Sequence, residues 1–294
     1  MTPKSRAALK AIVARREAVL VPGAANALFA RIIEELGFEA AYITGAGIAN
    51  MQLGVPDIGL TTLTEVANTV AAIADAVEIP LIVDADTGFG NELNVTRTVR
   101  LLERCGAAAI QLEDQVFPKK CGHFSGKEVI PLPEMIGKLK AALDARHDPN
   151  LQIVARTDAR ATDGLGSAIE RAQAFAETGA DIIFVEAPSS LEELETIAHE
   201  IKAPQIVNIV FGGKTPDPGH RQLKAWRFSI ALYANAALQA ALKGAFDVLS
   251  ALKRDGALSA VSERLASFEE RQRMVRKDRW DALENRLASK AERL

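Results

Sequence analysis

Short apolar runs of four or five residues recur along the chain, and amphipathic stretches separate them. Runs of this length suit buried strands, and their alternation with helices is typical of βαβ units in a parallel sheet. We predict eight strands, at Ala18 to Pro22, Ala40 to Thr44, Pro80 to Asp84, Ala108 to Leu112, Gln152 to Ala155, Asp181 to Val185, Gln205 to Asn208 and Phe228 to Leu232.

The stretches between these runs have one apolar face each, and several end at a glycine. Leu28, Ile32, Ile33 and Leu36 fall on one stripe of a predicted helix, and Gly37 follows it. Eight strands alternating with such helices predict an α/β fold, a (β/α)8 TIM-type barrel with its functional residues at the C-terminal strand ends. A doubly wound open sheet is the alternative, although the chain has neither a dinucleotide-binding glycine turn nor a Walker-type phosphate loop.

The strand pattern ends near Gly244, and a charged, helix-rich tail follows. An isolated helix pair would leave apolar positions of this tail partly uncovered, which favours an oligomer. These positions are Leu265, Phe268, Met274, Trp280, Leu283 and Leu287. We therefore expect a single barrel domain over residues 1–294, with a helical C-terminal extension over residues 244–294.

The composition is that of a globular protein. The 294 residues are 48% hydrophobic and carry a formal net charge of −3, which gives no general attraction to nucleic acid or to an anionic membrane. Residues 1–19 mix charged and apolar side chains and predict a solvent-facing helix rather than a signal peptide, and the apolar run from Val66 to Val77 is too short to span a bilayer. Two cysteines, Cys105 and Cys121, are too few for a disulfide framework, so we expect a cytoplasmic location.

Polar residues follow most of the predicted strands directly. Barrel geometry brings C-terminal strand ends to one mouth, so these residues are expected to form one site. They are Thr44, Gly45 and Ala46 after the second strand, Asp84 and Asp86 at the third, Glu113 and Asp114 at the fourth, Arg156 and Asp158 at the fifth, Glu186 at the sixth and Asn208 at the seventh.

Several carboxylates in one site repel each other unless a cation neutralises them. An all-oxygen ligand set without a histidine cluster favours a hard ion, Mg2+ or alternatively Mn2+. Asp84 and Asp86 are the leading metal ligands, with Asp57 and Glu113 nearby or behind them. The alternative is that Asp84 and Asp86 belong to an ordinary loop.

Arg156 follows an apolar run, and a guanidinium is suited to bidentate recognition of a carboxylate. The alternative is a structural salt bridge to Asp158 or Glu186. Gly45 and Gly47 allow backbone amides to approach an anion, or serve only a tight turn.

The segment from Ile110 to His123 places a cysteine among cations. Lys119, Lys120 and His123 flank Cys121, and their positive potential favours the thiolate and makes proton transfer near neutral pH plausible. The alternative is a surface turn in which Gly122 supplies backbone freedom. His123 has no second histidine or cysteine pair at zinc-site spacing, so we interpret it as a loop hydrogen-bond partner or anion contact.

Together these segments resemble the isocitrate lyase and phosphoenolpyruvate mutase superfamily, in its short-chain branch with 2-methylisocitrate lyase and 2,3-dimethylmalate lyase. The resemblance covers roughly residues 19–249. It is carried by residues 42–47 (YITGAG), 54–57 (GVPD), 83–90 (VDADTGFG), 113–115 (EDQ), 119–123 (KKCGH), 155–158 (ARTD) and 186–187 (EA).

The resemblance implies a Mg2+-dependent barrel enzyme that cleaves a carbon–carbon bond of a 2-hydroxy di- or tricarboxylate in a retro-aldol sense. It assigns Cys121 as the acid that protonates the resulting carbanion, and Tyr42 or a carboxylate as an aid to deprotonation. It also implies a homotetramer that exchanges C-terminal helices. The implied site comprises catalytic Cys121, Tyr42, Glu113 and His123, metal-binding Asp84 and Asp86, and substrate-binding Thr44, Gly45, Ala46, Asp57, Gly122, Arg156, Glu186, Asn208, Phe211 and Gln239.

Two departures from the superfamily pattern concern the substrate. Phe211 stands where many lyases of this branch have a glutamate, and Gln239 where methylisocitrate lyases tend to have an arginine. A malate-type dicarboxylate with alkyl substituents is therefore favoured over a tricarboxylate. Alternatives are carboxyphosphonoenolpyruvate or phosphonopyruvate mutase or hydrolase activity, oxaloacetate decarboxylation, and noncatalytic carboxylate binding.

Overall fold

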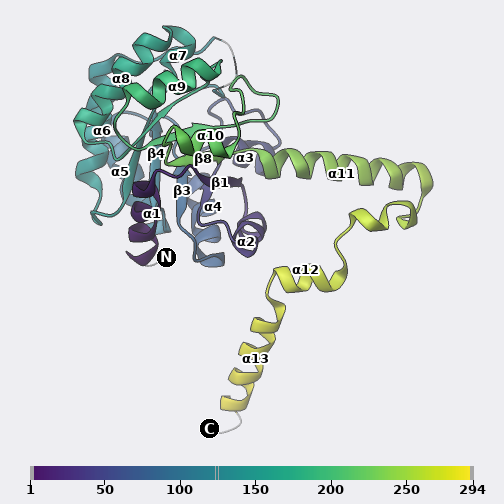
Figure 1. The fold of residues 1–294 in the computed structure, drawn as a ribbon. Coiled ribbons are helices and arrows are strands. Elements are labelled where there is room, and N and C mark those ends of the chain that lie inside the picture. Colours follow the sequence, from purple (N-terminus) through teal and green to yellow (C-terminus); the bar gives the residue numbers. More distant parts are fainter. Residues whose placement is uncertain (1–2, 123, 125, 292–294) are drawn as a thin grey trace. The chain divides into compact units, whose positions relative to one another are not determined.

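The computed structural model describes residues 3–122, 124 and 126–291. The chain divides into two compact units, Met1–Leu238 and Gln239–Leu294 (Figure 1). The prediction of one barrel domain with an extension from residue 244 stays a prediction.

The first unit contains a closed barrel of eight parallel strands in sequential order, β1 to β8. This confirms the predicted TIM-type barrel and rules out the open sheet. All eight predicted strands are present, shifted by a few residues at their ends. The strands are β1 Val19–Ala24, β2 Ala41–Ile43, β3 Leu81–Asp84, β4 Ala109–Glu113, β5 Gln152–Thr157, β6 Ile182–Val185, β7 Gln205–Asn208 and β8 Ile230–Tyr233.

Helices follow the strands and surround the barrel (Figure 1). Gly106 and Gly179 take positive φ angles of 110° and 104° at the C-caps of α5 and α8, as expected of glycine helix stops. The helices of this unit are α1 Pro3–Arg15, α2 Ala27–Glu35, α3 Gly45–Ile48, the π-helix η1 Ala49–Leu53, α4 Leu63–Ala76, α5 Glu92–Cys105, α6 Leu132–Ala145, α7 Ala159–Thr162, α8 Leu165–Thr178, α9 Leu191–Glu200 and α10 His220–Ala225.

Side-chain alternation along the strands produces two apolar clusters. One contains Tyr42, Phe184 and Leu232, and the other contains strand residues such as Ile43 together with helix residues such as Val70. Because successive strand side chains point to opposite faces, the first cluster fills the barrel and the second packs the helices on its outside.

The N-terminal helix α1 corrects one expectation. We predicted a solvent-facing helix, but Leu9, Ile12 and Val13 are buried and belong to the cluster inside the barrel. Their spacing of three and four residues gives α1 one apolar stripe. Arg6 of the same helix donates to the carbonyls of Glu103 and Ala107, which lie before β4. The helix therefore packs at the N-terminal end of the barrel.

All regular elements of the second unit among the residues described are helices, joined by short turns. It contains most of α11 Ala236–Asp255, the 3-10 helix η2 Ser259–Arg264, α12 Phe268–Met274 and α13 Lys277–Ala291. Large apolar side chains are exposed here, among them Leu242 (70%), Phe246 (69%) and Trp280 (62%). No helix in the described part of the chain combines the length and apolar character needed to cross a bilayer.

Candidate active site

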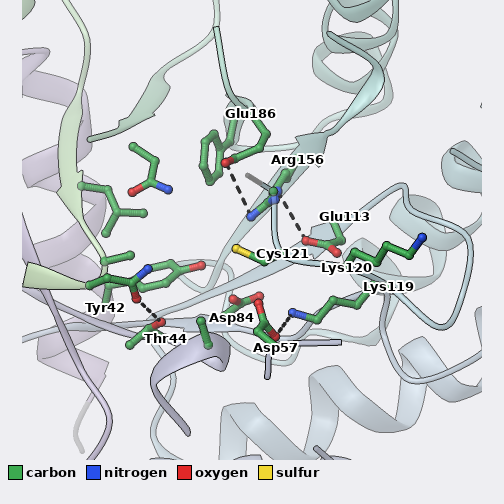
Figure 2. A pocket seen from close by; sticks show the side chains of 17 residues that line it. Tyr42, Thr44, Asp57, Asp84, Glu113, Lys119, Lys120, Cys121, Arg156 and Glu186 are labelled. Atoms are coloured by element: carbon green, nitrogen blue, oxygen red, sulfur yellow. Dashed lines mark hydrogen bonds and ion pairs between the residues drawn. The ribbon is translucent and has the colours of Figure 1, made fainter. Parts of the chain in front are cut away.

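A cavity opens among the C-terminal ends of the strands, where the polar strand-end residues were predicted to meet. Its volume is about 30 Å³, room for only a few water molecules. The lining residues are Tyr42, Thr44, Ala46, Asp57, Asp84, Glu113, Lys119, Lys120, Cys121, Gly122, Arg156, Phe184, Glu186, Asn208, Leu232, Ala234 and Asn235 (Figure 2). The structure thus brings together residues at the ends of β2 through β8, Asp57 from the segment after η1 and four residues of the loop after β4.

Asp84, the last residue of β3, organises one side of this cavity. Its carboxylate accepts hydrogen bonds from the backbone N–H groups of Gly45 (3.3 Å) and Asp86 (3.2 Å) and from the Gln111 amide (3.3 Å). Gln111 in turn accepts a 3.0 Å hydrogen bond from the Tyr42 hydroxyl. Gly45 therefore acts here through its backbone, beside the cavity.

Tyr42 is buried, and this determines its protonation state. Burial, followed by the charge of Asp84, raises the pKa of the Tyr42 phenol well above its usual value. The phenol therefore keeps its proton at neutral pH. This favours Tyr42 as a hydrogen-bond donor over a role as base.

Lys119 lies among carboxylates on the same side. Its ammonium group pairs with Asp57 and lies 2.9 Å from Asp86 Oδ1. Burial alone would lower the pKa of Lys119, but the carboxylates, Asp86 and Glu113 foremost, raise it well above its usual value. Burial raises the pKa of Asp86 to about 7, with Lys119 opposing and Asp84 adding to the effect. Lys119 therefore serves as a fixed positive charge.

The donor set here fits a hard divalent cation. No group of three or more histidine, cysteine, aspartate or glutamate side chains among the described residues is arranged to enclose a metal. Mg2+ does not require one, because it keeps several waters and uses one or two protein carboxylates. Asp84 lines the cavity and Asp86 is buried two residues further along the chain, and the buried Glu113 Oε1 accepts no hydrogen bond from the described residues. Asp84, with Asp86 reached directly or through water, fits such an ion.

Arg156 at the end of β5 is surrounded by carboxylates on the other side of the cavity. Its Nε lies 2.9 Å from Asp158 Oδ2. Its Nε also lies 3.3 Å from Glu113 Oε2, and its Nη1 lies 3.6 Å from Glu186 Oε2 (Figure 2). The guanidinium also lies 5.2 Å from the centre of the Phe184 ring. The sequence left a salt bridge and an anion site as alternatives; Arg156 makes the salt bridges and also lines the cavity.

The same cluster changes the pKa of its acidic members in opposite directions. Burial raises the pKa of Glu113 well above its usual value, against the attraction of Arg156. Burial acts in the same sense on Asp158, but Arg156 and Lys127 outweigh it and lower the pKa of Asp158 to about 2. Asp158 is therefore a permanent anion, whereas Glu113 is able to carry a proton.

The loop after β4 brings Cys121 to the cavity, and Figure 2 shows its sulfur directed inward. The Cys121 backbone N–H donates to the Asp57 carbonyl at 3.0 Å. Neither cysteine forms a disulfide. Gly122 packs so closely that a Cβ atom there would lie 2.6 Å from Arg156 Nη2 and even closer to Glu186 Oε1. Predicted residue His123 lies outside the described residues.

Two residues that we predicted to set substrate specificity are not among the residues that line this cavity. Phe211 follows β7, is 89% exposed and is absent from the lining. Gln239 belongs to α11 in the second unit. The cavity wall at β6 and β8 is instead formed by Phe184, Leu232 and Ala234.

Several site residues were not recognised from the sequence. Asn235 lies two residues after β8 and accepts a hydrogen bond from the Thr44 hydroxyl at 3.4 Å. Polar residues after β2 through β7 are candidates in the sequence, and the same criterion applied to β8 would have found Asn235. Gln111 is a polar residue inside a buried strand, which is itself a signal. No local pattern marked Lys127, whose partners lie elsewhere in the chain.

Known proteins with similar sequences share this architecture. The family described as phosphoenolpyruvate phosphomutase matches residues 9–253. The 2,3-dimethylmalate lyase of Eubacterium barkeri is 45% identical over 264 residues, which cover 90% of this chain and 91% of that protein. The 2-methylisocitrate lyase of Aeropyrum pernix is 43% identical over 286 residues, covering 97% and 92%.

A solved structure extends the similarity to phosphonate chemistry. Phosphonopyruvate hydrolase, in a complex with oxalate and Mg2+, superposes with a TM-score of 0.88 at 31% identity and covers 97% of this chain and 99% of that one. The similar proteins thus include lyases named for carboxylates and a hydrolase named for a phosphonate.

Proposed function

The chain belongs to the phosphoenolpyruvate phosphomutase family, in the isocitrate lyase superfamily, and from this membership we propose that it is a Mg2+-dependent lyase of substituted malates. It cleaves a carbon–carbon bond of a 2-hydroxy dicarboxylate to an α-keto acid and a second carboxylate. The observation that carries the proposal is the thiol of Cys121 in a cavity with Arg156 and Glu113. A thiol at this place can supply the proton that a carbon leaving group needs.

Substrate orientation begins at Arg156, whose guanidinium binds the carboxylate of the future keto acid. The backbone at Thr44, Gly45 and Ala46 contributes to the same half of the site. Mg2+, held by Asp84 and Asp86, supplies charge stabilisation to the substrate oxygens when it is bound. This arrangement fixes the hydroxyl carbon near the carboxylate cluster.

Proton transfers complete the reaction. The substrate hydroxyl loses its proton to a carboxylate, and we assign this role to Glu113 because it lines the cavity and its Oε1 accepts no hydrogen bond from the described residues. The O–H electrons form the keto group, the carbon–carbon bond breaks, and its electron pair stays on the departing carbon. Cys121 then donates its proton to that carbon, and Tyr42 keeps its own.

Substrate selectivity follows from the cavity wall. Phe184, Leu232 and Ala234 contribute apolar surface to the same cavity, and we propose that this surface accommodates alkyl groups on the malate. Asp57, Glu186 and Asn208 also line the cavity, and we propose them as further substrate contacts. We propose a dicarboxylate rather than a tricarboxylate, a choice that rests on the sequence departures at Phe211 and Gln239.

Phosphonopyruvate hydrolase or mutase activity is the second candidate, favoured by the similarity to phosphonopyruvate hydrolase. A panel of 2,3-dimethylmalate, malate, 2-methylisocitrate, oxaloacetate and phosphonopyruvate, each with Mg2+ and coupled detection of keto acid, separates the candidates. We expect the fastest turnover with an alkyl malate. Turnover of phosphonopyruvate alone would refute the lyase, oxaloacetate decarboxylation would identify the other alternative, and binding without turnover would indicate a noncatalytic carboxylate-binding protein.

Assembly and location complete the proposal. The exposed apolar residues of the second unit support a homotetramer in which copies cover each other's C-terminal helices. We place the enzyme in the cytoplasm, acting on a small carboxylate without nucleic acid or membrane partners. Light scattering tests the tetramer, and a monomeric mass would contradict it.

A further inference from the structure

Lys127 is a buried lysine that lies outside the cavity lining. Its side chain is 1% exposed, and its Nζ lies 2.5 Å from Asp158 Oδ1 and 2.6 Å from the Gly122 carbonyl oxygen. An ammonium group removed from water to this degree needs such charged and polar partners. One side chain thus joins the loop backbone beside Cys121 to the end of β5.

The carboxylate that Lys127 contacts is held rigidly. Asp158 accepts hydrogen bonds from Arg156 Nε (2.9 Å) and Nη2 (3.2 Å), and its own backbone N–H donates to Asp114 Oδ1 at 2.9 Å. Asp114 is in turn paired with Arg171 at 2.8 Å. Asp158 is therefore a fixed point that orients the guanidinium of Arg156.

The loop atom that Lys127 contacts belongs to a residue pressed against the same arginine. Gly122 leaves no room for a Cβ atom between itself and Arg156 or Glu186. On the other side of the thiol, the Cys121 N–H is bonded to the Asp57 carbonyl. Hydrogen bonds therefore hold the backbone on both sides of the Cys121 side chain, one to the Asp57 carbonyl and one from Lys127 to the Gly122 carbonyl.

We propose that Lys127 is a positioning residue that holds Gly122 against Arg156, and so sets the place of the Cys121 thiol relative to the bound carboxylate. The proposal rests on the proposed lyase function only for its kinetic consequence. Lys127 transfers no proton and touches no substrate. It couples the orientation of Arg156 to the position of Cys121 through Asp158.

The test uses Lys127→Met in a Cys105→Ser background, in which Cys121 is the only remaining cysteine. Without substrate, iodoacetamide should alkylate Cys121 roughly tenfold faster, because loss of charge-assisted hydrogen bonds frees the loop. With substrate, kcat should fall about 100-fold while KM changes little, since misplacement of a reacting group by about 1 Å costs this much. Lys127→Arg should restore part of both properties.

Lys140→Met provides the matched control, because Lys140 is an exposed lysine on the neighbouring helix α6. It should leave the alkylation rate and kcat unchanged. If Lys127 only stabilised the fold, Lys127→Met would lower the melting temperature. The alkylation rate and kcat, each corrected for the folded fraction, would then stay at the parent values, and this result would overturn the proposal. If Lys127→Met does not fold, Lys127→Gln takes its place under the same criteria. The alkylation rate needs no substrate, so the proposal can fail or stand independently of the lyase assignment.

Discussion

Gly122 and Arg156 are in such close contact that a Cβ atom on Gly122 would lie 2.6 Å from Arg156 Nη2. This contact joins the loop that carries Cys121 to the residue that we propose binds the substrate carboxylate. The two halves of the proposed chemistry, anion binding and proton delivery, are therefore fixed by one packing contact.

Gly122→Ala should displace the loop, because its Cβ atom would meet the Glu186 carboxylate and the Arg156 guanidinium, which are held in a buried ion cluster. We expect kcat/KM to fall about 100-fold by misplacement of Cys121. Gly166→Ala is the control, since a Cβ atom there meets nothing within 4 Å. Steady-state kinetics of both variants check this, and equal rates would show that the contact is unimportant for turnover.

Cys121→Ser should lower kcat by about 10²- to 10⁴-fold, the usual contribution of a general acid, because a hydroxyl is a much weaker acid than a thiol. Binding of Mg2+ and substrate should persist, as measured by calorimetry. Cys105→Ser should keep full activity, because Cys105 lies on α5 outside the cavity lining. Unchanged turnover in Cys121→Ser would remove the thiol from the mechanism.

Mg2+ affinity should depend on pH through Asp86. Its pKa is raised to about 7, so below that pH the carboxyl is mostly protonated and must lose its proton to bind the cation. The apparent affinity should therefore rise as pH increases from about 6 and level off by about 8, with a slope near one proton. Titration calorimetry measures this. Asp86→Asn should abolish the slope, and a wild-type affinity independent of pH would contradict the assignment.

Arg156→Met should lower both stability and substrate affinity. Asp158, Glu113 and Glu186 would lose a shared cation, although Asp158 would keep Lys127. Removing one partner from a buried ion cluster typically costs about 3–5 kcal/mol of unfolding free energy. Urea denaturation measures the loss. Arg254→Met is the control, because the Arg254–Asp255 pair is exposed to solvent and should add little to stability. Equal losses in the two variants would mean that the Arg156 cluster does not stabilise the fold.

The helical tail should control assembly. Phe246→Glu together with Trp280→Glu places charges on exposed apolar positions that we expect another copy to cover. The tetramer should then dissociate to smaller species in light scattering. Lys253→Glu changes charge at an exposed position of the same helix α11 and should leave the mass unchanged. A double variant that keeps the parent mass would show that these two side chains lie outside any subunit contact.

The barrel was predictable because its strands are continuous apolar runs followed by polar residues. A parallel barrel buries each strand on both sides. Its strands are therefore recognisable in the sequence as short apolar runs, as at Leu81–Asp84 and Ile182–Val185. The same regularity of strand ends was sufficient to predict that Asp84, Arg156 and Glu186 meet at one mouth of the barrel.

The features that the sequence did not predict depend on contacts between segments that are distant along the chain. Lys127 meets Asp158 across 31 positions, and nothing in its neighbourhood distinguishes it from a solvated loop lysine. The burial of one face of α1 depends on the barrel end that it meets. Phe211 was chosen because it stands where the resemblance places a glutamate, and this resemblance did not indicate that its side chain would be 89% exposed.

The central claim is that the enzyme breaks a carbon–carbon bond and that Cys121 protonates the departing carbon. Turnover of 2,3-dimethylmalate with Mg2+ in D2O, followed by proton NMR, tests it most directly. We expect equal amounts of keto acid and carboxylate product, with one deuterium on the carbon that was released, and almost no product from Cys121→Ser. Keto acid formed from phosphonopyruvate but not from any malate, or undiminished deuterated product from Cys121→Ser, would contradict the account.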